Sequence, residues 1–233
     1  MKTLQYMDLG CCEYGETWEK QEFLMQEIIL KKLSYQHMPL EERPVTPGYL
    51  IFVEHPPVYT LGKSGEAHNL LLNSAQLAEK KVGFYNTNRG GDITFHGPGQ
   101  LVGYPILDLE NFGLGLRQYI YSIEETIIHA LSQFGLAVSR DEEATGVWLD
   151  AGLPAARKIC AIGVKSSRHV TMHGFALNVN TDLDYFRYIH PCGLIDKGVT
   201  SMEKELGESQ DLEQVKKVVL SSFLSIFDAS LPL

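Results

Sequence analysis

Three stretches of this 233-residue chain repeat apolar side chains at the spacing of an amphipathic helix. They run over residues 17–33, 116–134 and 212–226, and the second is followed by Gly135, a residue type that commonly ends helices. Each stretch is long enough for a complete helix, and its apolar stripe predicts packing against a core. The fold must therefore bury one face of three helices.

Five further segments have the β-branched, aromatic or alternating composition of strands. They cover residues 49–55, 82–88, 100–109, 158–166 and 170–180. The last two are joined by SSRH, which predicts a hairpin. Helices and strands do not alternate regularly along the chain, and this order favours an α+β fold around a mixed or antiparallel sheet. The length suits a single domain over residues 1–233.

Residues 89–100 read RGGDITFHGPGQ and combine four glycines with Arg89, Asp92, His96 and Gln100. Glycines let a backbone approach a ligand closely, because no Cβ stands in the way. A simple glycine-rich connection between two strands is the alternative interpretation. The density of glycines and polar side chains favours a ligand-binding loop instead of a core strand.

Charge and cysteine usage narrow the functional class. The net charge of −9 argues against a broad nucleic-acid surface. The four cysteines have no C-x-x-C spacing, which is typical of a reducing compartment. The first twenty residues lack the apolar core of a signal peptide, and the longest apolar runs are too short for a membrane span. We therefore expect a cytoplasmic protein with neither nucleic-acid nor membrane partners.

Cys192 lies between Pro191 and Gly193, in a segment without helical or strand periodicity. A cysteine on such a turn is expected to be accessible, and a neighbouring base or cation would make it nucleophilic. The alternative is a small side chain buried under a loop. The candidate bases or cations are His55, His96, His173, His190 and Lys158, which begins an apolar strand.

The other cysteines and the histidine spacing carry weaker signals. Cys160 lies within an apolar strand and is predicted to be in the core, and Cys11 and Cys12 have no activating neighbour. His169 and His173 would share a strand face, but no carboxylate or cysteine joins them at ligand spacing. HExxH and GxxxxGK[ST] are both absent, so we expect no metal and no P-loop nucleotide site.

Several of these segments occur together in one known family. They are residues 89–109, GVW at 146–148, KICAIGV at 158–164, HGFALNVN at 173–180 and HPCG at 190–193, which is followed by VTSM. In this order, over roughly residues 50–205, the chain resembles the octanoyltransferases of lipoate biosynthesis, also called lipoyl(octanoyl) transferases.

The resemblance implies an acyltransferase with the fold of the biotin and lipoate protein ligase catalytic domains. That fold is a mixed β-sheet with flanking helices, placed on one side. The implied reaction moves an octanoyl group from octanoyl-acyl carrier protein to a lysine of a lipoyl domain, without a cofactor. The implied acceptors are 2-oxoacid dehydrogenase E2 subunits and the glycine-cleavage H protein. Because both carriers are expected to be acidic, Lys and Arg side chains should lie near the site entrance.

From the matching motifs, the resemblance implies that Cys192 is the nucleophile that carries the acyl thioester. It implies that Lys158 is the partner of Cys192, either as a base or as an electrostatic neighbour. The residues implied to bind substrate are Arg89, Gly90, Gly91, Asp92, Ile93, Thr94, Phe95, His96, Ala161, Ile162, Gly163, Gly174, Phe175 and Ala176. Two alternatives remain open: an ATP-dependent lipoate- or biotin-protein ligase of the same fold, and a non-catalytic homologue that only binds carrier domains.

Overall fold

A computed structural model describes residues 2–190 and 197–232, and within this part a large mixed sheet forms the centre of the molecule. Its strand order is β10-β8-β9-β6-β2-β1-β11, and β7 pairs with β8. The strands are β1 (Lys2–Cys11), β2 (Gly48–Glu54), β6 (Gln100–Ile106), β7 (Val147–Leu149), β8 (Arg157–Ser167), β9 (Val170–Asn178), β10 (Gly198–Val199) and β11 (Ala229–Ser230). Parallel and antiparallel pairs both occur, so the predicted mixed sheet is confirmed.

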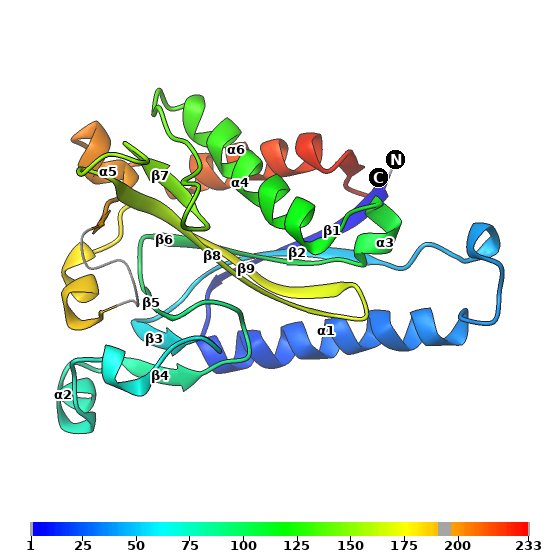
Figure 1. Cartoon of the computed structure of the whole chain (residues 1–233), viewed down its shortest axis with the longest axis horizontal. Coiled ribbons are helices and arrows are strands. Elements are labelled where there is room, and N and C mark those ends of the chain that lie inside the picture. The colour runs from blue at the N-terminus through cyan, green and yellow to red at the C-terminus, as the bar shows by residue number, and fades with distance from the viewer. Residues whose placement is uncertain (1, 191–196, 233) are drawn as a thin grey trace.

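Helices cover both faces of this sheet (Figure 1). Helix α1 (Tyr14–Ser34) lies on one face, and α4 (Leu116–Ser132) and α6 (Leu212–Ile226) pack together on the other. Alternating side chains of β2 divide between two apolar cores: Leu50 and Phe52 face α4 and α6, whereas Ile51 and Val53 face α1. The expectation that helices lie on one side was wrong, because both faces of the central strands are apolar.

The three predicted helices and five predicted strands all occur, with shifted ends. Helix α1 connects the parallel strands β1 and β2, so the chain does contain one β-α-β crossover, which the coarse sequence pattern did not indicate. The hairpin predicted at SSRH joins β8 and β9, and both turn residues, Arg168 and His169, have positive φ. This hairpin is the longest antiparallel pair of the sheet and one wall of the site described below.

A second sheet of three strands lies beside the start of α1, in the order β4-β3-β5 (Figure 1). It consists of β3 (Val58–Leu61), β4 (Gly83–Asn86) and β5 (Ile93–His96). Strand β5 lies inside the glycine-rich segment that the sequence suggested was a binding loop. The expectation of a loop was wrong for residues 93–96, because they form a strand that pairs with β3 and in which Ile93, Phe95 and His96 are buried.

Short helical elements complete the described chain. They are η1 (Leu40–Glu42), η2 (Ala67–Asn69), α2 (Ser74–Glu79), α3 (Leu109–Phe112), η3 (Leu183–Tyr188) and α5 (Met202–Leu206). Asn73 caps α2 with a capping box, and Ser201 caps α5 by accepting from the Lys204 amide. No helix in the described ranges is long and apolar enough to cross a membrane.

Candidate active site

A cavity of about 950 Å³ opens between the two sheets, along the start of the β8–β9 hairpin. Most of the residues expected at the substrate site line it: Arg89, Gly91, Asp92, Ile93, Thr94, His96, Ala161, Ile162, Gly163, Gly174, Phe175 and Ala176, together with Lys158. These residues come from three separate stretches of the chain. The fold therefore brings the widely spaced motifs to one concave surface.

Two residues expected at the substrate site, Gly90 and Phe95, are not part of the cavity lining. The Phe95 ring stacks on Tyr185 at a centroid distance of 4.4 Å and is buried in a small core of its own. The Gly90 amide donates to the Val164 carbonyl at 2.8 Å, which ties the glycine-rich segment to β8. Their contacts give both residues a role in supporting the wall of the cavity.

The glycines of the motifs are needed for packing within the protein. A Cβ at Gly163 would come within 2.9 Å of the Gly90 carbonyl oxygen, and one at Gly174 within 2.2 Å of the Gly103 carbonyl oxygen. Both contacts are with backbone, which cannot easily move. These glycines let segment 89–92 and strand β6 approach the hairpin, so they shape the cavity by bringing its walls together.

Lys158 holds its amine in a partly buried position at the cavity. Its Nζ donates to the Thr145 carbonyl at 3.0 Å and lies 4.6 Å from the centre of the Trp148 ring. Burial lowers the pKa of Lys158 to about 8, and the positive charge of Lys197 acts in the same direction. Cys160, Asp141 and Glu124 oppose this shift in the pKa of Lys158. Such a lysine can exchange a proton near neutral pH.

Lys197 shares the Trp148 ring with Lys158. Its Nζ lies 5.2 Å from the ring centre and forms a 2.8 Å ion pair with Asp141. The sequence analysis included Trp148 only as part of the GVW motif and did not single out Lys197, because neither spacing nor composition brings these two residues to Lys158. The ring is buried, and its Nε1 donates to the Ala144 carbonyl at 2.9 Å. Trp148 therefore forms a fixed apolar surface under two cations.

A buried carboxylate organises the turn that faces Lys158. Glu124 of α4 accepts the Gly146 amide at 2.9 Å and pairs with Arg140 at 3.1 Å. Gly146 has a φ of 131°, and a Cβ there would come within 2.7 Å of the Cys160 carbonyl oxygen. The turn can therefore pass directly beside the Lys158 side chain only with glycine at this position.

Cys192 lies outside the described residues, between two described residues that both line the cavity. His190 precedes the segment and donates its amide to the Asn69 carbonyl at 2.8 Å, and Lys197 follows it. Residues 198 and 199 then pair with Arg157 and Lys158 of β8. The described residues on both sides of segment 191–196 therefore lie at the cavity.

The other three cysteines do not line the cavity. Cys160 is buried in the core as predicted, and burial raises the pKa of its thiol well above the usual range. Cys11 is exposed and Cys12 is partly buried, and neither lines the cavity. Within the described ranges, no three His, Cys, Asp or Glu side chains gather as a metal site would require.

Arg89 and His96 are held by the protein itself at the inner part of the cavity. The Arg89 guanidinium donates to the Thr60 carbonyl at 2.5 Å and to the Thr60 hydroxyl at 2.9 Å. His96 pairs through Nδ1 with Gln100 at 2.8 Å, and burial lowers its pKa well below the usual value. A histidine in this state is neutral at physiological pH. Both side chains are therefore fixed in position at the cavity.

Other aromatic and histidine side chains close the inner end of the cavity. Tyr14 of α1 stacks on His96 at 5.8 Å, and the Tyr104 hydroxyl is 2.8 Å from Nε2 of His55. Of the four histidines considered as bases, His96, His173 and His190 line the cavity, whereas His55 does not. Burial lowers the pKa of His55 to about 4, so it stays neutral. His169 is exposed at the hairpin turn.

Basic side chains gather at the cavity entrance. Arg187, Lys197 and Lys204 line it together with two carboxylates, Asp184 and Glu143. Arg187 and Lys204 are exposed. Arg187 pairs with Asp184 at 3.1 Å, and Lys197 pairs with Asp141 at 2.8 Å, so carboxylates offset part of this positive charge. Lys and Arg side chains are present near the site, as expected, but they alternate with acidic ones.

Comparison with known proteins identifies the family to which this chain belongs. The lipoyl protein ligase A/B catalytic domain matches residues 18–224. An octanoyltransferase of Flavobacterium johnsoniae is 54% identical over 231 residues, or 99% of each chain. Another, from Flavobacterium psychrophilum, is 53% identical over 230 residues, or 98% of each chain.

The fold has a matching solved structure. A chain in the structure of a bipartite lipoate protein ligase and its E2 lipoyl domain, from Thermoplasma acidophilum, superposes with a TM-score of 0.71. The match covers 100% of this chain and 86% of the other at 14% identity, so it concerns the fold alone. The sequence matches are far closer and extend over almost the whole length. The chain belongs to the octanoyltransferases, within the family of lipoyl protein ligase A/B catalytic domains.

Proposed function

We propose that residues 1–233 act as one domain that transfers an octanoyl group from octanoyl-acyl carrier protein to a lysine of a lipoyl domain, through a thioester on Cys192. One observation carries the proposal: Lys158 lines the cavity whose edge includes both residues that flank segment 191–196. The family membership supports the acyl group and the reaction class.

The first half-reaction is a thioester exchange. The Cys192 thiolate attacks the octanoyl carbonyl, a new C–S bond forms, and the bond to the carrier thiol breaks. The carrier thiol leaves with the proton that Cys192 gave up. No ATP is needed, because the thioester is already activated. The carrier arm would enter past Arg187 and Lys204, whose charges suit the phosphate of a pantetheine arm.

The second half-reaction transfers the acyl group to an amine. The lysine of the lipoyl domain attacks the acyl-cysteine, the amide C–N bond forms, and the bond to Cys192 breaks. The proton lost by the amine restores the Cys192 thiol. Acceptors of the proposed kind are the E2 subunits of 2-oxoacid dehydrogenases and the glycine-cleavage H protein.

Lys158 has two proposed roles in these steps. As a base, it would take the Cys192 proton and return it to the leaving thiol, and a pKa of about 8 places this exchange near working pH. As a cation, it would stabilise the thiolate by charge alone. Both roles need the amine within reach of the thiol, and both are removed by a neutral side chain at position 158. A cytoplasmic location, expected from the cysteine pattern, stays a prediction.

The test is intact-mass analysis of the full chain mixed with octanoyl-acyl carrier protein in the absence of ATP. We expect one octanoyl adduct, mapped to the peptide containing Cys192, that disappears when a lipoyl domain is added. Cys192→Ser should block this cycle, and Cys12→Ser is the matched cysteine control that should not. A transfer that requires ATP would instead assign a ligase. Carrier binding without any adduct would assign a non-catalytic homologue.

A further inference from the structure

Segment 140–146 is held at its two ends by one buried carboxylate, that of Glu124 on α4. Oε1 of Glu124 accepts the Gly146 amide at 2.9 Å, and Oε2 accepts Nε of Arg140 at 3.1 Å. Between residues that the structure describes, no backbone-to-backbone hydrogen bond involves residues 141–145. The position of the segment therefore depends on side-chain contacts, and Glu124 supplies one at each end.

The same segment fixes the surroundings of the Lys158 amine. The Thr145 carbonyl accepts a hydrogen bond from Lys158 Nζ at 3.0 Å, and Gly146 passes beside the Lys158 side chain. The Ala144 carbonyl accepts Nε1 of Trp148 at 2.9 Å, which holds the ring whose centre lies 4.6 Å from the same Nζ. Two neighbouring carbonyls of one short segment thus control the hydrogen bond and the ring contact of this amine.

A carbonyl acceptor suits a lysine that changes its protonation state. The ammonium and the neutral amine both carry N–H groups, so either form of Lys158 can donate to Thr145. In the neutral form the lone pair must point away from that carbonyl, whose position therefore restricts the direction from which a proton is taken. Proton transfer depends steeply on such geometry, because a displacement of about 1 Å can cost about 100-fold in rate.

Glu124 does not reach the substrate side of this arrangement. It is 7% exposed and does not line the cavity, whereas Ala144 and Thr145 do. The neighbouring Glu125 pairs with Arg140 at 2.6 Å, and so supports the same end of the segment as one oxygen of Glu124. The bond to the Gly146 amide, next to Thr145, is the contact that distinguishes Glu124 from its neighbour.

We propose that Glu124 is a positioning residue for acyl transfer, which fixes segment 140–146 so that the Thr145 carbonyl orients the Lys158 amine. This inference rests on the proposed function, in which Lys158 exchanges a proton or stabilises a thiolate. Loss of the carboxylate releases the Gly146 end of the segment, and the amine then loses a fixed acceptor. The rate of transfer falls as a result, whereas carrier binding does not change, because Glu124 does not line the cavity.

The charge of Glu124 gives a second signature, which a purely structural role would not produce. Burial lowers the pKa of Lys158, and the charge of Lys197 acts in the same direction. Cys160, Asp141 and Glu124 oppose this shift in the pKa. Removal of the negative charge of Glu124 should therefore lower the pKa of Lys158 further.

The test compares Glu124→Ala with Glu124→Gln in the full chain, using octanoyl-acyl carrier protein and a lipoyl domain. Alanine leaves the Gly146 amide without its acceptor, whereas glutamine keeps a carbonyl oxygen for it and removes the charge. At the pH optimum of each variant, we expect kcat to fall by about 30-fold in Glu124→Ala and by less than about threefold in Glu124→Gln, with KM for the carrier unchanged. Glu125→Ala removes a partner of Arg140 but leaves the Gly146 bond, so this control should transfer at the wild-type rate.

A second readout needs no transfer. Competitive acetylation by acetic anhydride at a series of pH values, followed by peptide mass spectrometry, measures the pKa and the reactivity of the Lys158 amine. We expect Glu124→Gln to lower this pKa by less than about one unit. Above the pKa, Lys158 should be acetylated about threefold faster in Glu124→Ala, because its hydrogen bond to Thr145 is no longer held, and at the wild-type rate in Glu124→Gln.

These readouts separate the inference from the proposed function. If the wild type transfers no octanoyl group but the variants are acetylated in this pattern, the proposed function fails and the positioning role remains. A folded Glu124→Ala that transfers and is acetylated like the wild type would overturn the inference, as would equal losses of kcat in the two Glu124 variants. Should Glu124→Ala fail to fold, as judged by circular dichroism, Glu124→Gln decides. An unchanged pKa of Lys158 in that variant, or a loss of kcat above about tenfold, would then overturn the inference.

Discussion

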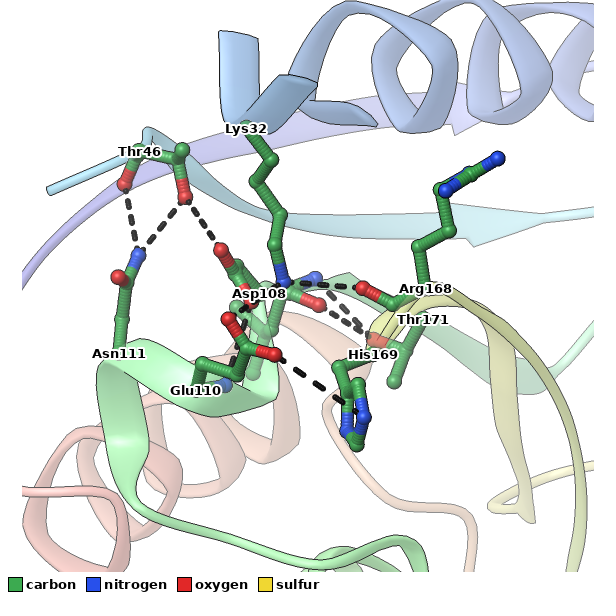
Figure 2. Close-up of polar contacts among 9 residues, drawn as sticks. Lys32, Thr46, Asp108, Glu110, Asn111, Arg168, His169 and Thr171 are labelled. Carbon is green, nitrogen blue, oxygen red and sulfur yellow. Dashed lines mark hydrogen bonds and ion pairs between the residues drawn. The ribbon is translucent and has the colours of Figure 1, made fainter. Parts of the chain in front are cut away.

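The two ends of the β8–β9 hairpin each meet a partly buried lysine, and the two lysines have opposite surroundings. Lys32 of α1 meets the turn of the hairpin, whereas Lys158 begins its first strand. Figure 2 shows the first of these, with Lys32 directed at Asp108 and at the Arg168 carbonyl. The comparison separates a lysine placed for stability from one placed for chemistry.

Lys32 has an acceptor for each of its three protons. Its Nζ lies 2.6 Å from Asp108, 2.9 Å from the Arg168 carbonyl and 3.1 Å from Glu110. Asp108 is itself satisfied, because it also accepts the Thr46 hydroxyl and caps α3 (Figure 2). This arrangement joins α1, the end of β6 and the hairpin turn, and none of its side chains lines the cavity beside Lys158.

Lys158 has one carbonyl, one aromatic ring and a second cation as its neighbours. Burial without a direct carboxylate partner disfavours its charged form, and this lowers its pKa to about 8. Such an environment destabilises the folded protein while the amine is protonated. The difference between the two lysines indicates that the fold tolerates a less stable environment for Lys158 at the cavity.

The largest predicted effect is on catalysis. Lys158→Met should lower the rate of octanoyl transfer by about 10³-fold, the range expected for loss of a positioned proton donor or acceptor. Lys32→Met should transfer at close to the wild-type rate per folded molecule, because Lys32 is at the other end of the hairpin. Single-turnover transfer from octanoyl-acyl carrier protein measures both. Equal losses in the two variants would remove the distinction between the lysines.

The next effect is on stability. Lys32→Met leaves Asp108 buried without its cation and should lower the free energy of unfolding by about 3 kcal/mol. Urea unfolding of the full chain measures this change. The neighbouring Lys31, whose ion pair with Glu27 is exposed, supplies the control, and Lys31→Met should leave the midpoint unchanged within error. A similar shift in both variants would mean that helix α1 responds to any loss of lysine.

The smallest effect concerns the pH dependence of transfer. The charge of Lys197 helps to lower the pKa of Lys158, second to burial. Lys197→Met should therefore raise the pKa of Lys158 and move the rising limb of the kcat/KM profile to higher pH, by less than about one unit. Lys204→Met, a second lysine of the cavity lining, is the matched charge control and should shift the profile less. A shift to lower pH would contradict the arrangement of the two cations over Trp148.

Local patterns in the sequence predicted much of the fold. The three long helices and the hairpin turn follow from apolar periodicity and from turn residues, which act over a few neighbours. Strand β5 was missed because its four residues are enclosed by glycines, and its pairing with β3 is a tertiary choice. The position of α1 on the opposite face from α4 was missed for a similar reason, since periodicity shows which side of a helix is apolar but not which sheet face it covers.

Sequence motifs likewise predicted part of the candidate site, and the rest depends on contacts between distant residues. The positions of Lys158 and most of segment 89–96 at one cavity were expected from motifs, and Cys192 stays a prediction. Lys197 carried no signal, and Trp148 was noted only within the GVW motif, because their place beside Lys158 comes from contacts between residues distant in sequence. The positive φ of His173 is likewise invisible in a sequence that reads as a regular strand.

The most direct test of the account is the free energy of unfolding of Lys158→Met compared with the wild type between pH 6 and pH 10. Below pH 8 the wild-type fold carries a buried ammonium, and burial has lowered its pKa from 10.5 to about 8. Between those values the unfolded chain holds a proton that the folded chain has released, so wild-type stability gains with rising pH. We predict that Lys158→Met is more stable by about 2 kcal/mol at pH 7, with the difference fading towards pH 10. A variant that is less stable than the wild type at every pH would contradict the account and make Lys158 a structural lysine like Lys32.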